Sequence, residues 1–277
     1  MAIVQKLGIL MSVYHSDDPA LLDRALESIL LQEISAPSEI RIYLGVDGPI
    51  PDSLQVVINR YKPYIYKLLI FKSNRGLASV LNELIRVRED EEFFFRMDAD
   101  DRSSPQRLDR QLAHMRMYPE VDILGTDMWE IDISTGQERT VRFGGSRDNA
   151  RKSISRRVPV AHPTVCFRAR VFQSVQEYPE IRFNEDVAMW FACLKAGMIF
   201  DNLHEPLYYF TIGDDFWRRR SVLKAWTECM IYVKGIWTLD GLTWKYIYPF
   251  IRLLIRLGPK HLQRAAYSSS LRLQKST

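Results

Sequence analysis

Three carboxylates follow one apolar run and are the first candidates for chemistry. The run Phe93–Met97 leads directly into Asp98, Asp100 and Asp101. A run of this kind predicts a buried strand, and open α/β sheets bind ligands where their strands end. Carboxylates gathered there repel one another unless a cation joins them. The simplest such cation is a divalent metal that arrives with a nucleotide diphosphate.

A structural role is the alternative for the same residues. Aspartate favours strand-to-loop turns, and Asp101 or Ser104 would cap a helix opened by Pro105. The acidic run by itself leaves both interpretations open, so the elements around it have to be considered.

Strands and helices alternate along the first 125 residues. Apolar patterns predict strands at Lys6–Val13, Ile40–Val46, Tyr66–Phe71, Glu92–Met97 and Val121–Gly125, and helices at Pro19–Leu30, Leu77–Val87 and Pro105–Met117. This order predicts an α/β fold with a mainly parallel central sheet flanked by helices. Further on we expect a hairpin at Trp129–Phe143, strands at Thr164–Phe167 and Tyr208–Thr211, and a helix at Glu185–Ala196.

Residues that could contact a ligand through a side chain or the backbone stand at the ends of the first four predicted strands. They are Ser12, Val13 and Tyr14, then Asp47, then Asn74 and Gly76, and finally Asp98 and Asp100. In a doubly wound sheet these ends lie side by side. We expect Tyr14 to carry a base, Asp47 to accept a base N–H, Asp98 to hold a ribose hydroxyl or a metal, and Asp100 to hold the metal. An ordinary turn at Asp47 and a helix-start turn at Asn74 and Gly76 are the alternatives.

Length, composition and cysteine spacing limit the classes of protein to which the chain can belong. The chain has 277 residues, 47% of them hydrophobic, enough for one large core. Leu7–Val13 is too short to span a membrane, and we expect neither a signal peptide nor a transmembrane helix. Cys166, Cys193 and Cys229 lack CxxC spacing, which favours a reducing compartment over a zinc site or disulfides.

Charge divides the chain into two predicted regions. Residues 218–277 carry 12 Lys and Arg against 2 Asp and Glu, whereas the 217 residues before them carry 26 against 32. We predict a body at residues 1–215 and a basic amphipathic helical region at residues 216–277. The basic tail predicts contact with an anionic surface.

Large apolar residues alternate with basic ones in residues 244–275. The run from Trp244 to Leu257 is rich in Trp, Tyr, Ile and Leu, with Lys245, Arg252 and Arg256 between them. This pattern is typical of helices on an anionic membrane leaflet. The alternative is helices that pack on the body and turn their basic faces outward.

Seven motifs in chain order resemble family 2 of the glycosyltransferases. They are Ser12-Val13-Tyr14-His15 with Ser28-Ile29-Leu30-Leu31-Gln32, Val46-Asp47-Gly48-Pro49, Asn74–Asn82, Asp98-Ala99-Asp100-Asp101, His162–Phe167, Glu185–Trp190 and Glu205–Tyr209. The resemblance covers about residues 6–221. Within the family, the ending Gly213–Arg220 is similar to that of enzymes that build bacterial O-antigen, capsule or exopolysaccharide.

The resemblance implies a single A-type glycosyltransferase domain and a metal-dependent inverting reaction. It implies transfer of a hexose or N-acetylhexosamine from a UDP-sugar to a hydroxyl of a saccharide, lipid-diphosphate-linked, on the cytoplasmic face of the bacterial plasma membrane. Asp186 would be the catalytic base, and Asp98, Ala99 and Asp100 would form the motif that binds the donor with Mn²⁺ or Mg²⁺.

Two of these sites allow a second interpretation, and one position differs from the family pattern. The acidic pair Glu185-Asp186 would also suit a plain helix start. Arg218, with Arg219 and Arg220, would close over the diphosphate or simply begin the basic tail. Many relatives carry a histidine after the Tyr208-Tyr209 strand as a metal ligand, but this stretch has none. Asp214 or Asp215 would substitute for it.

Two other functions compete with this interpretation. A sugar-nucleotide-forming nucleotidyltransferase would need a glycine-rich basic loop after the first strand, and Ser12–Pro19 has no glycine. The chain also lacks the GxGxxG and GxxxxGK[ST] patterns. A basic-tailed nucleic-acid or membrane binding protein is the non-enzymatic alternative. Because the body is net acidic and the tail cations alternate with large aliphatics, we expect no nucleic-acid partner.

Overall fold

One large mixed sheet forms the centre of the computed structural model, which describes residues 4–181, 183–213 and 222–258. The strand order is β3-β2-β1-β4-β8-β6-β9-β5, with β7 paired to β6. The strands are β1 (Gln5–Tyr14), β2 (Ser38–Asp47), β3 (Ile65–Ile70), β4 (Phe93–Met97), β5 (Arg102–Ser103), β6 (Ile123–Asp132), β7 (Gln137–Val141), β8 (Cys166–Arg168) and β9 (Phe200–Ile212).

The first four long strands are parallel, as the sequence predicts. β1 pairs with β2 and β4, and β2 pairs with β3, all in parallel. Beyond β4, β8 runs antiparallel to both β4 and β6, while β6 and β9 are parallel to each other. The strands β1 to β4 therefore deliver their carboxyl ends to a single edge.

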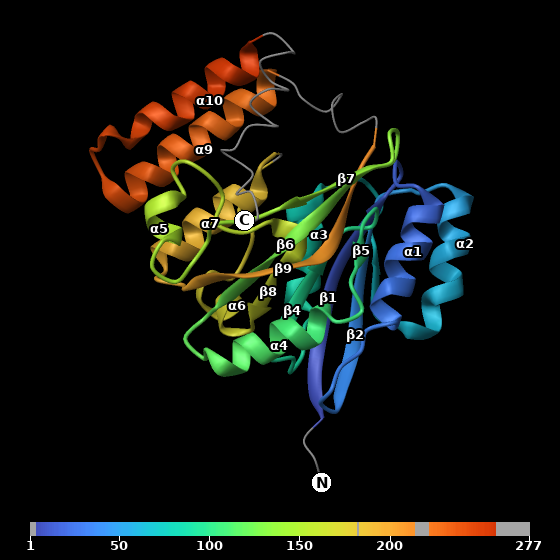
Figure 1. Ribbon diagram of the computed structural model, residues 1–277. Coiled ribbons are helices and arrows are strands. Elements are labelled where there is room, and N and C mark those ends of the chain that lie inside the picture. The colour runs from blue at the N-terminus through green and yellow to red at the C-terminus, as the bar shows by residue number, and fades with distance from the viewer. Residues whose placement is uncertain (1–3, 182, 214–221, 259–277) are drawn as a thin grey trace.

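Helices cover both faces of the sheet (Figure 1). They are α1 (Pro19–Leu30), α2 (Asp52–Tyr61), α3 (Leu77–Arg86), α4 (Arg107–Met117), α5 (Ala150–Ser153), α6 (Arg170–Ser174), α7 (Glu185–Lys195), α9 (Val222–Asp240) and α10 (Ile247–Leu257). α1, α2 and α4 contribute to one hydrophobic cluster, and α3, α5, α6, α7 and α9 to the other.

Alternate side chains of the central strands enter opposite clusters. Phe93 and Phe95 pack with the α1 side, and Phe94 packs with the α3 side. Since both faces are covered, the strand reads as a continuous apolar run rather than an alternating one. The prediction of β4 as a buried strand is confirmed.

Most predicted elements are observed, and two differ in informative ways. The helix α2 was missed, although Leu54, Val57 and Ile58 face the core at helical spacing. The predicted strand at Tyr208–Thr211 is the end of the 13-residue β9. The residues around Glu205 are polar and do not resemble a strand, so the sequence did not predict the full length of β9. The pairing of β9 with β6 shifts register at this point.

The starts of α1 and α4 differ in how they are capped. The Asp18 side chain accepts the N–H groups of Ala20 and Leu21 and so caps the start of α1. The alternative interpretation, in which Asp101 or Ser104 caps the helix after the acidic run, is not observed. α4 begins at Arg107 after Gln106 and has no side-chain cap, and the Ser104 hydroxyl bonds the Gln106 side chain instead.

The hairpin of α9 and α10 lies at one end of the molecule (Figure 1). α9 packs on α7, where Phe191 and Tyr232 meet edge to face with ring centroids 5.5 Å apart. α10 packs on α9 in turn. Among the residues that the structure describes, no helix is long and apolar enough to cross a membrane.

Candidate active site

The carboxyl ends of β1 and β2 lie next to each other. Tyr14 is the register partner of Asp47 at the last position of these strands. Val13 is fully buried in the core, so only its backbone is available to a ligand. Ser12 and Tyr14 are partly exposed, and Tyr14 packs edge-on against His15.

The carboxylate of Asp47 holds the turn that precedes α3. It accepts the backbone N–H of Arg75 at 2.6 Å and that of Gly76 at 2.9 Å. Gly48 has a φ of 86°, and a side chain there would come within 2.7 Å of the Asn74 nitrogen. The turn between Ser73 and Gly76 is therefore fixed against the end of β2. Whether Asp47 also accepts a hydrogen bond from a base stays a prediction.

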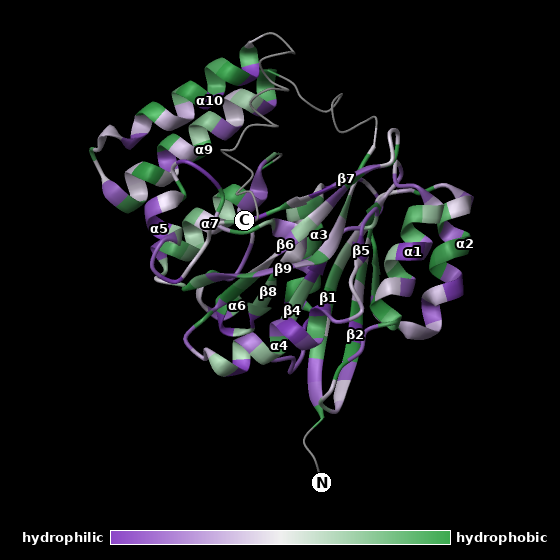
Figure 2. Cartoon of the chain, viewed as in Figure 1, coloured by the Kyte–Doolittle hydropathy of each residue, from purple (hydrophilic) through white to green (hydrophobic). Residues whose placement is uncertain are grey.

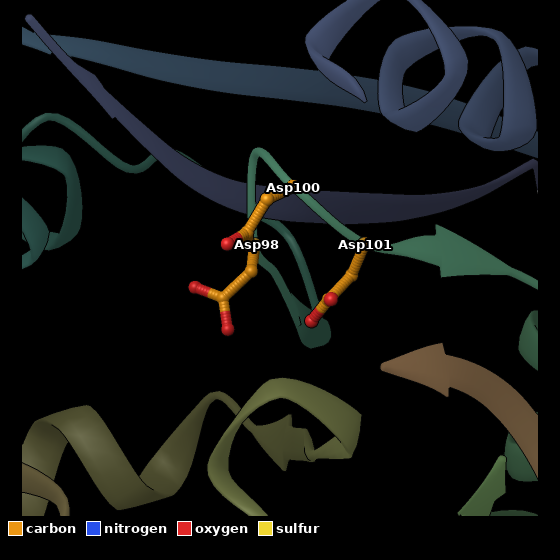
Figure 3. Close-up of side chains that lie close together, drawn as sticks. All are labelled: Asp98, Asp100 and Asp101. Atoms are coloured by element: carbon orange, nitrogen blue, oxygen red, sulfur yellow. The ribbon is translucent and has the colours of Figure 1, made fainter. Parts of the chain in front are cut away.

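The three aspartates after β4 converge. One ligand oxygen from each of Asp98, Asp100 and Asp101 lies within 4.8 Å of the others. Figure 3 shows Asp98 and Asp100 beside each other on the turn and Asp101 facing them. The hydroxyl of Tyr208, on β9, accepts the N–H of Asp98 at 3.1 Å.

Asp101 is the buried member of this group. Its Oδ1 accepts the Thr211 N–H at 2.7 Å, while its Oδ2 is buried and has no hydrogen-bond partner. Burial and the neighbouring charges of Asp100 and Asp98 raise the pKa of Asp101 well above its ordinary value. An orphaned carboxylate oxygen beside two more carboxylates suits a hard divalent cation, which prefers oxygen ligands. These residues therefore fit the implied Mn²⁺ or Mg²⁺.

A buried arginine balances part of this negative charge. Arg96 precedes the acidic turn on β4, is almost fully buried and forms an ion pair with Asp98. Its guanidinium also donates to the carbonyl of Met97, and its Nε has no partner. The cation thus fixes Asp98 at the end of the strand.

A second pair of acids begins α7. Asn184 adopts a left-handed conformation with a φ of 58°, and Glu185 and Asp186 form the first turn. Desolvation raises the pKa of both groups, and the charge of Asp98 adds to the effect on each. The acids of α7 and the acidic turn after β4 therefore share one electrostatic environment.

A buried polar network lies beneath these acids. The side chain of Asn82 bonds the backbone N–H and carbonyl of Tyr178 at 2.7 and 3.0 Å. The Tyr178 hydroxyl bonds His162 at 2.9 Å. Burial and the charge of Arg96 lower the pKa of His162, which keeps it neutral. His162 is thus a buried, hydrogen-bonded histidine, and Trp190 beside it is part of the core.

The sequence located most of these positions but not their partners. It singled out Asp47, Asn74, Gly76, Asp98, Asp100 and Asp186. Arg96 was missed, although a cation inside an apolar strand was a visible signal. The contact of Asp101 with β9 left no signal in the sequence. Arg218, Asp214 and Asp215 lie outside the described residues.

Comparison with known proteins agrees with the fold. Residues 9–178 match the model of glycosyl transferase family 2. The chain is 28% identical to the amylovoran biosynthesis glycosyltransferase AmsE of Erwinia amylovora, over 94% of this chain and 97% of that protein. It is 29% identical to an Escherichia coli UDP-Gal:alpha-D-GlcNAc-diphosphoundecaprenol beta-1,3-galactosyltransferase, over 79% and 78% of the two chains.

Among solved structures, the fold is similar to that of S. aureus TarS 1–349 in complex with UDP-GlcNAc. The TM-score is 0.67 at 18% identity, over 96% of this chain and 74% of that one. The single A-type domain with helices around its sheet is therefore confirmed. Because the family model spans more than half of the residues, the chain belongs to glycosyl transferase family 2.

Proposed function

We propose that this protein is an inverting glycosyltransferase that uses a UDP-sugar in bacterial surface polysaccharide synthesis. The donated sugar would be a hexose or an N-acetylhexosamine, and the acceptor a hydroxyl of a lipid-diphosphate-linked saccharide. The observation that carries the proposal is the acidic group Asp98, Asp100 and Asp101 at the sheet edge, in one electrostatic environment with the α7 carboxylates.

The relatives support the same chemistry. The E. coli relative is described as using UDP-Gal with a diphosphoundecaprenol-linked sugar, and AmsE serves amylovoran biosynthesis. TarS binds UDP-GlcNAc in a fold of the same type. A lipid-linked acceptor would bring this enzyme to the cytoplasmic face of the membrane as a peripheral protein.

The donor site would use the ends of the first four strands. The uracil would rest near Ser12 and Tyr14, with the Asp47-fixed turn at Asn74 and Gly76 along the nucleoside. Asp98 would hold the ribose or the metal, and Asp100 the metal, with Ala99 between them. A divalent cation bound there would neutralise the departing diphosphate. Arg218, outside the described residues, would contact the same diphosphate.

Asp186 would act as the general base. The acceptor oxygen forms a bond to the anomeric carbon as the bond from that carbon to UDP breaks, and the acceptor proton passes to the Asp186 carboxylate. Attack from the face opposite UDP inverts the configuration. A positioned base of this kind contributes about 10²–10⁴ in rate. Its raised pKa makes it a stronger base than an exposed aspartate.

Calorimetric titration tests the donor site. UDP and GDP would each be titrated into the protein with and without Mn²⁺, and the titrations repeated with Asp100→Ala. We expect UDP to bind in a metal-dependent manner and the variant to lose that dependence. Asp132→Ala, in the β6–β7 hairpin turn, is a matched control that should bind as the wild type does. Metal-independent binding of UDP, or none, would refute the role of the acidic group.

A further inference from the structure

The outward face of the α9–α10 hairpin is apolar and has no partner within the described residues. On α10 the side chains of Ile247, Phe250, Ile251, Leu254 and Leu257 are between 46% and 70% exposed. They recur at helical spacing and form one continuous stripe. Figure 2 shows the hydrophobic colouring along α10, the outermost helix of the molecule. Trp244 and Leu242 extend this face at the turn, at 66% and 88% exposure.

Both arginines of α10 reach an acid on α9, with the side chain of Arg252 23% and that of Arg256 41% exposed. Arg252 and Arg256 both pair with Glu228, on α9, at 3.4 and 2.7 Å. Arg252 also stacks over the ring of Tyr232, 4.1 Å from its centroid. This arrangement differs from helices that pack on the body with basic faces outward. The arginines fasten α10 to α9 and leave the apolar stripe outside.

A basic segment borders this face at the turn of the hairpin. Residues 149–157 contain four cations and no acid, and Arg151, Lys152 and Arg156 are exposed. Arg151 donates to the carbonyl of Leu239 at 2.8 Å, and Arg156 lies 4.9 Å from the ring centroid of Tyr248. The border is therefore in direct contact with both helices.

The sequence after α10 is also positively charged. The chain continues from α10 into residues 259–277, which contain Lys260, Arg264, Arg272 and Lys275 and no acid. An apolar face with aromatic residues and a basic border matches the headgroup region of an anionic membrane.

We propose that the outward α10 stripe, Trp244 and the Arg151–Arg156 border form the surface by which this protein docks on an anionic lipid bilayer. The inference rests on the proposed function, because only a membrane-borne acceptor needs such a surface. α9 packs on α7, and α7 begins with Glu185 and Asp186. Docking through the hairpin would therefore bring a lipid-linked sugar to the end of the molecule that holds the proposed base.

Vesicle flotation of the full-length protein tests this surface. The vesicles would contain phosphatidylglycerol and phosphatidylethanolamine, with phosphatidylcholine vesicles as the neutral comparison. The variants are Leu254→Glu with Ile251→Glu for the stripe and Arg151→Gln with Lys152→Gln for the border. Val56→Glu, at an equally exposed apolar position on α2, is the matched control.

We expect the wild type and Val56→Glu to float with anionic vesicles only. The fraction of the stripe variant bound to vesicles should be lower than that of the wild type by about tenfold or more. The border variant should also bind less, and its binding should change less with salt concentration. All variants should keep the wild-type circular dichroism spectrum and UDP affinity. Failure of UDP binding with intact flotation would refute the proposed function but not the docking surface.

Two results would overturn the inference. One is flotation of the stripe variant equal to that of the wild type. The other is a wild-type dimer, measured by light scattering in solution, that dissociates in the stripe variant while neither protein floats. In that case the stripe would be covered by a second copy of the chain.

Discussion

At the scale of single residues, the site is a balance of buried charge. Three aspartates share a small volume, and Arg96 compensates mainly for Asp98. Asp101 has one oxygen bound to the Thr211 N–H and one without a partner. An uncompensated buried carboxylate costs free energy, so we expect Asp101 to destabilise the fold when no cation is bound.

Replacing Asp101 with asparagine tests that expectation. The pKa of Asp101 is raised in the folded state, so its destabilising effect appears as pH rises from the unfolded value near 3.9 through the folded value. In EDTA at neutral pH, we expect Asp101→Asn to be more stable by at least about 1 kcal/mol. The amide oxygen still accepts the Thr211 N–H. Thermal melts between pH 4 and 8 should show the two proteins converging at low pH.

Asp132→Asn serves as a comparison of opposite sign. Hydrogen bonds from Ser134 lower the pKa of Asp132, so this substitution should reduce stability at neutral pH and have no effect at low pH. If Asp101→Asn proves less stable than the wild type without metal, Asp101 does not destabilise the fold. Added Mn²⁺ should stabilise the wild type more than Asp101→Asn.

The proposed base gives a prediction about pH. Desolvation raises the pKa of Asp186, and a general base is active only when ionised. Activity should therefore fall with decreasing pH through a value above the ordinary pKa of about 3.9. With the UDP-sugar that the wild type uses as donor, Asp186→Asn should release UDP about 10²–10⁴ times more slowly. The variant should bind UDP as tightly as the wild type does. A steady-state pH profile checks both statements, and an inactive Glu185→Gln beside an active Asp186→Asn would reverse the assignment.

At the scale of elements, long-range contacts set the position of each loop. β9 reaches the acidic turn through Tyr208 and Thr211, and α3 presents its first turn to the Asp47 carboxylate. α9 approaches α7 closely, because Gly235 lies directly against the ring of Phe191. These contacts join the two predicted regions of the chain into a continuous core.

Gly235→Ala tests the closeness of that approach. A Cβ at this position would lie 2.3 Å from Cγ of Phe191, so the ring must move within a packed core. We expect a net loss of about 1–3 kcal/mol in the free energy of unfolding, despite the helix propensity of alanine. Gly213→Ala is the matched control, because its Cβ would meet only Ile133 at 3.7 Å. Urea unfolding followed by circular dichroism measures both, and equal stability would argue against tight packing.

At the scale of the whole molecule, one sheet carries the proposed donor site, and a helical hairpin packs on α7, the helix that carries the proposed base. The cluster on the α3 face includes Tyr232 and Ile236 of α9 together with residues of α7. α10 takes little part in either cluster and exposes its apolar side chains. The molecule thus combines a packed catalytic body with an outward surface suited to a partner.

Two truncations separate these parts. Removal of residues 259–277 should weaken vesicle binding, because the lost residues are basic. Removal of residues 222–277 should cost at least about 3 kcal/mol of stability, since it strips Tyr232 and Ile236 from the core. Vesicle flotation of the first truncated protein and calorimetry of the second check these outcomes. An unchanged melting temperature after the longer deletion would support the predicted boundary at residues 215 and 216, which otherwise stays a prediction.

Local patterns in the sequence determined the order of the elements and most of the candidate site. Apolar runs identified β1 to β4, and the residues after each run identified Asp47, Asn74, Asp98 and Asp100. This succeeds because parallel strands with covered faces need continuous apolar runs, and their carboxyl ends meet at one edge. The sequence also indicated Asp186, through its resemblance to the family.

Only the tertiary structure decided which side chains became partners. Nothing near Asp101 predicts its bond to Thr211, 110 residues away, and nothing near Arg252 and Arg256 predicts that both pair with Glu228. Such choices depend on how distant segments pack. Helical periodicity shows only that a helix has two faces. Which face packs on the protein, and so which partner a charged side chain meets, depends on the tertiary structure.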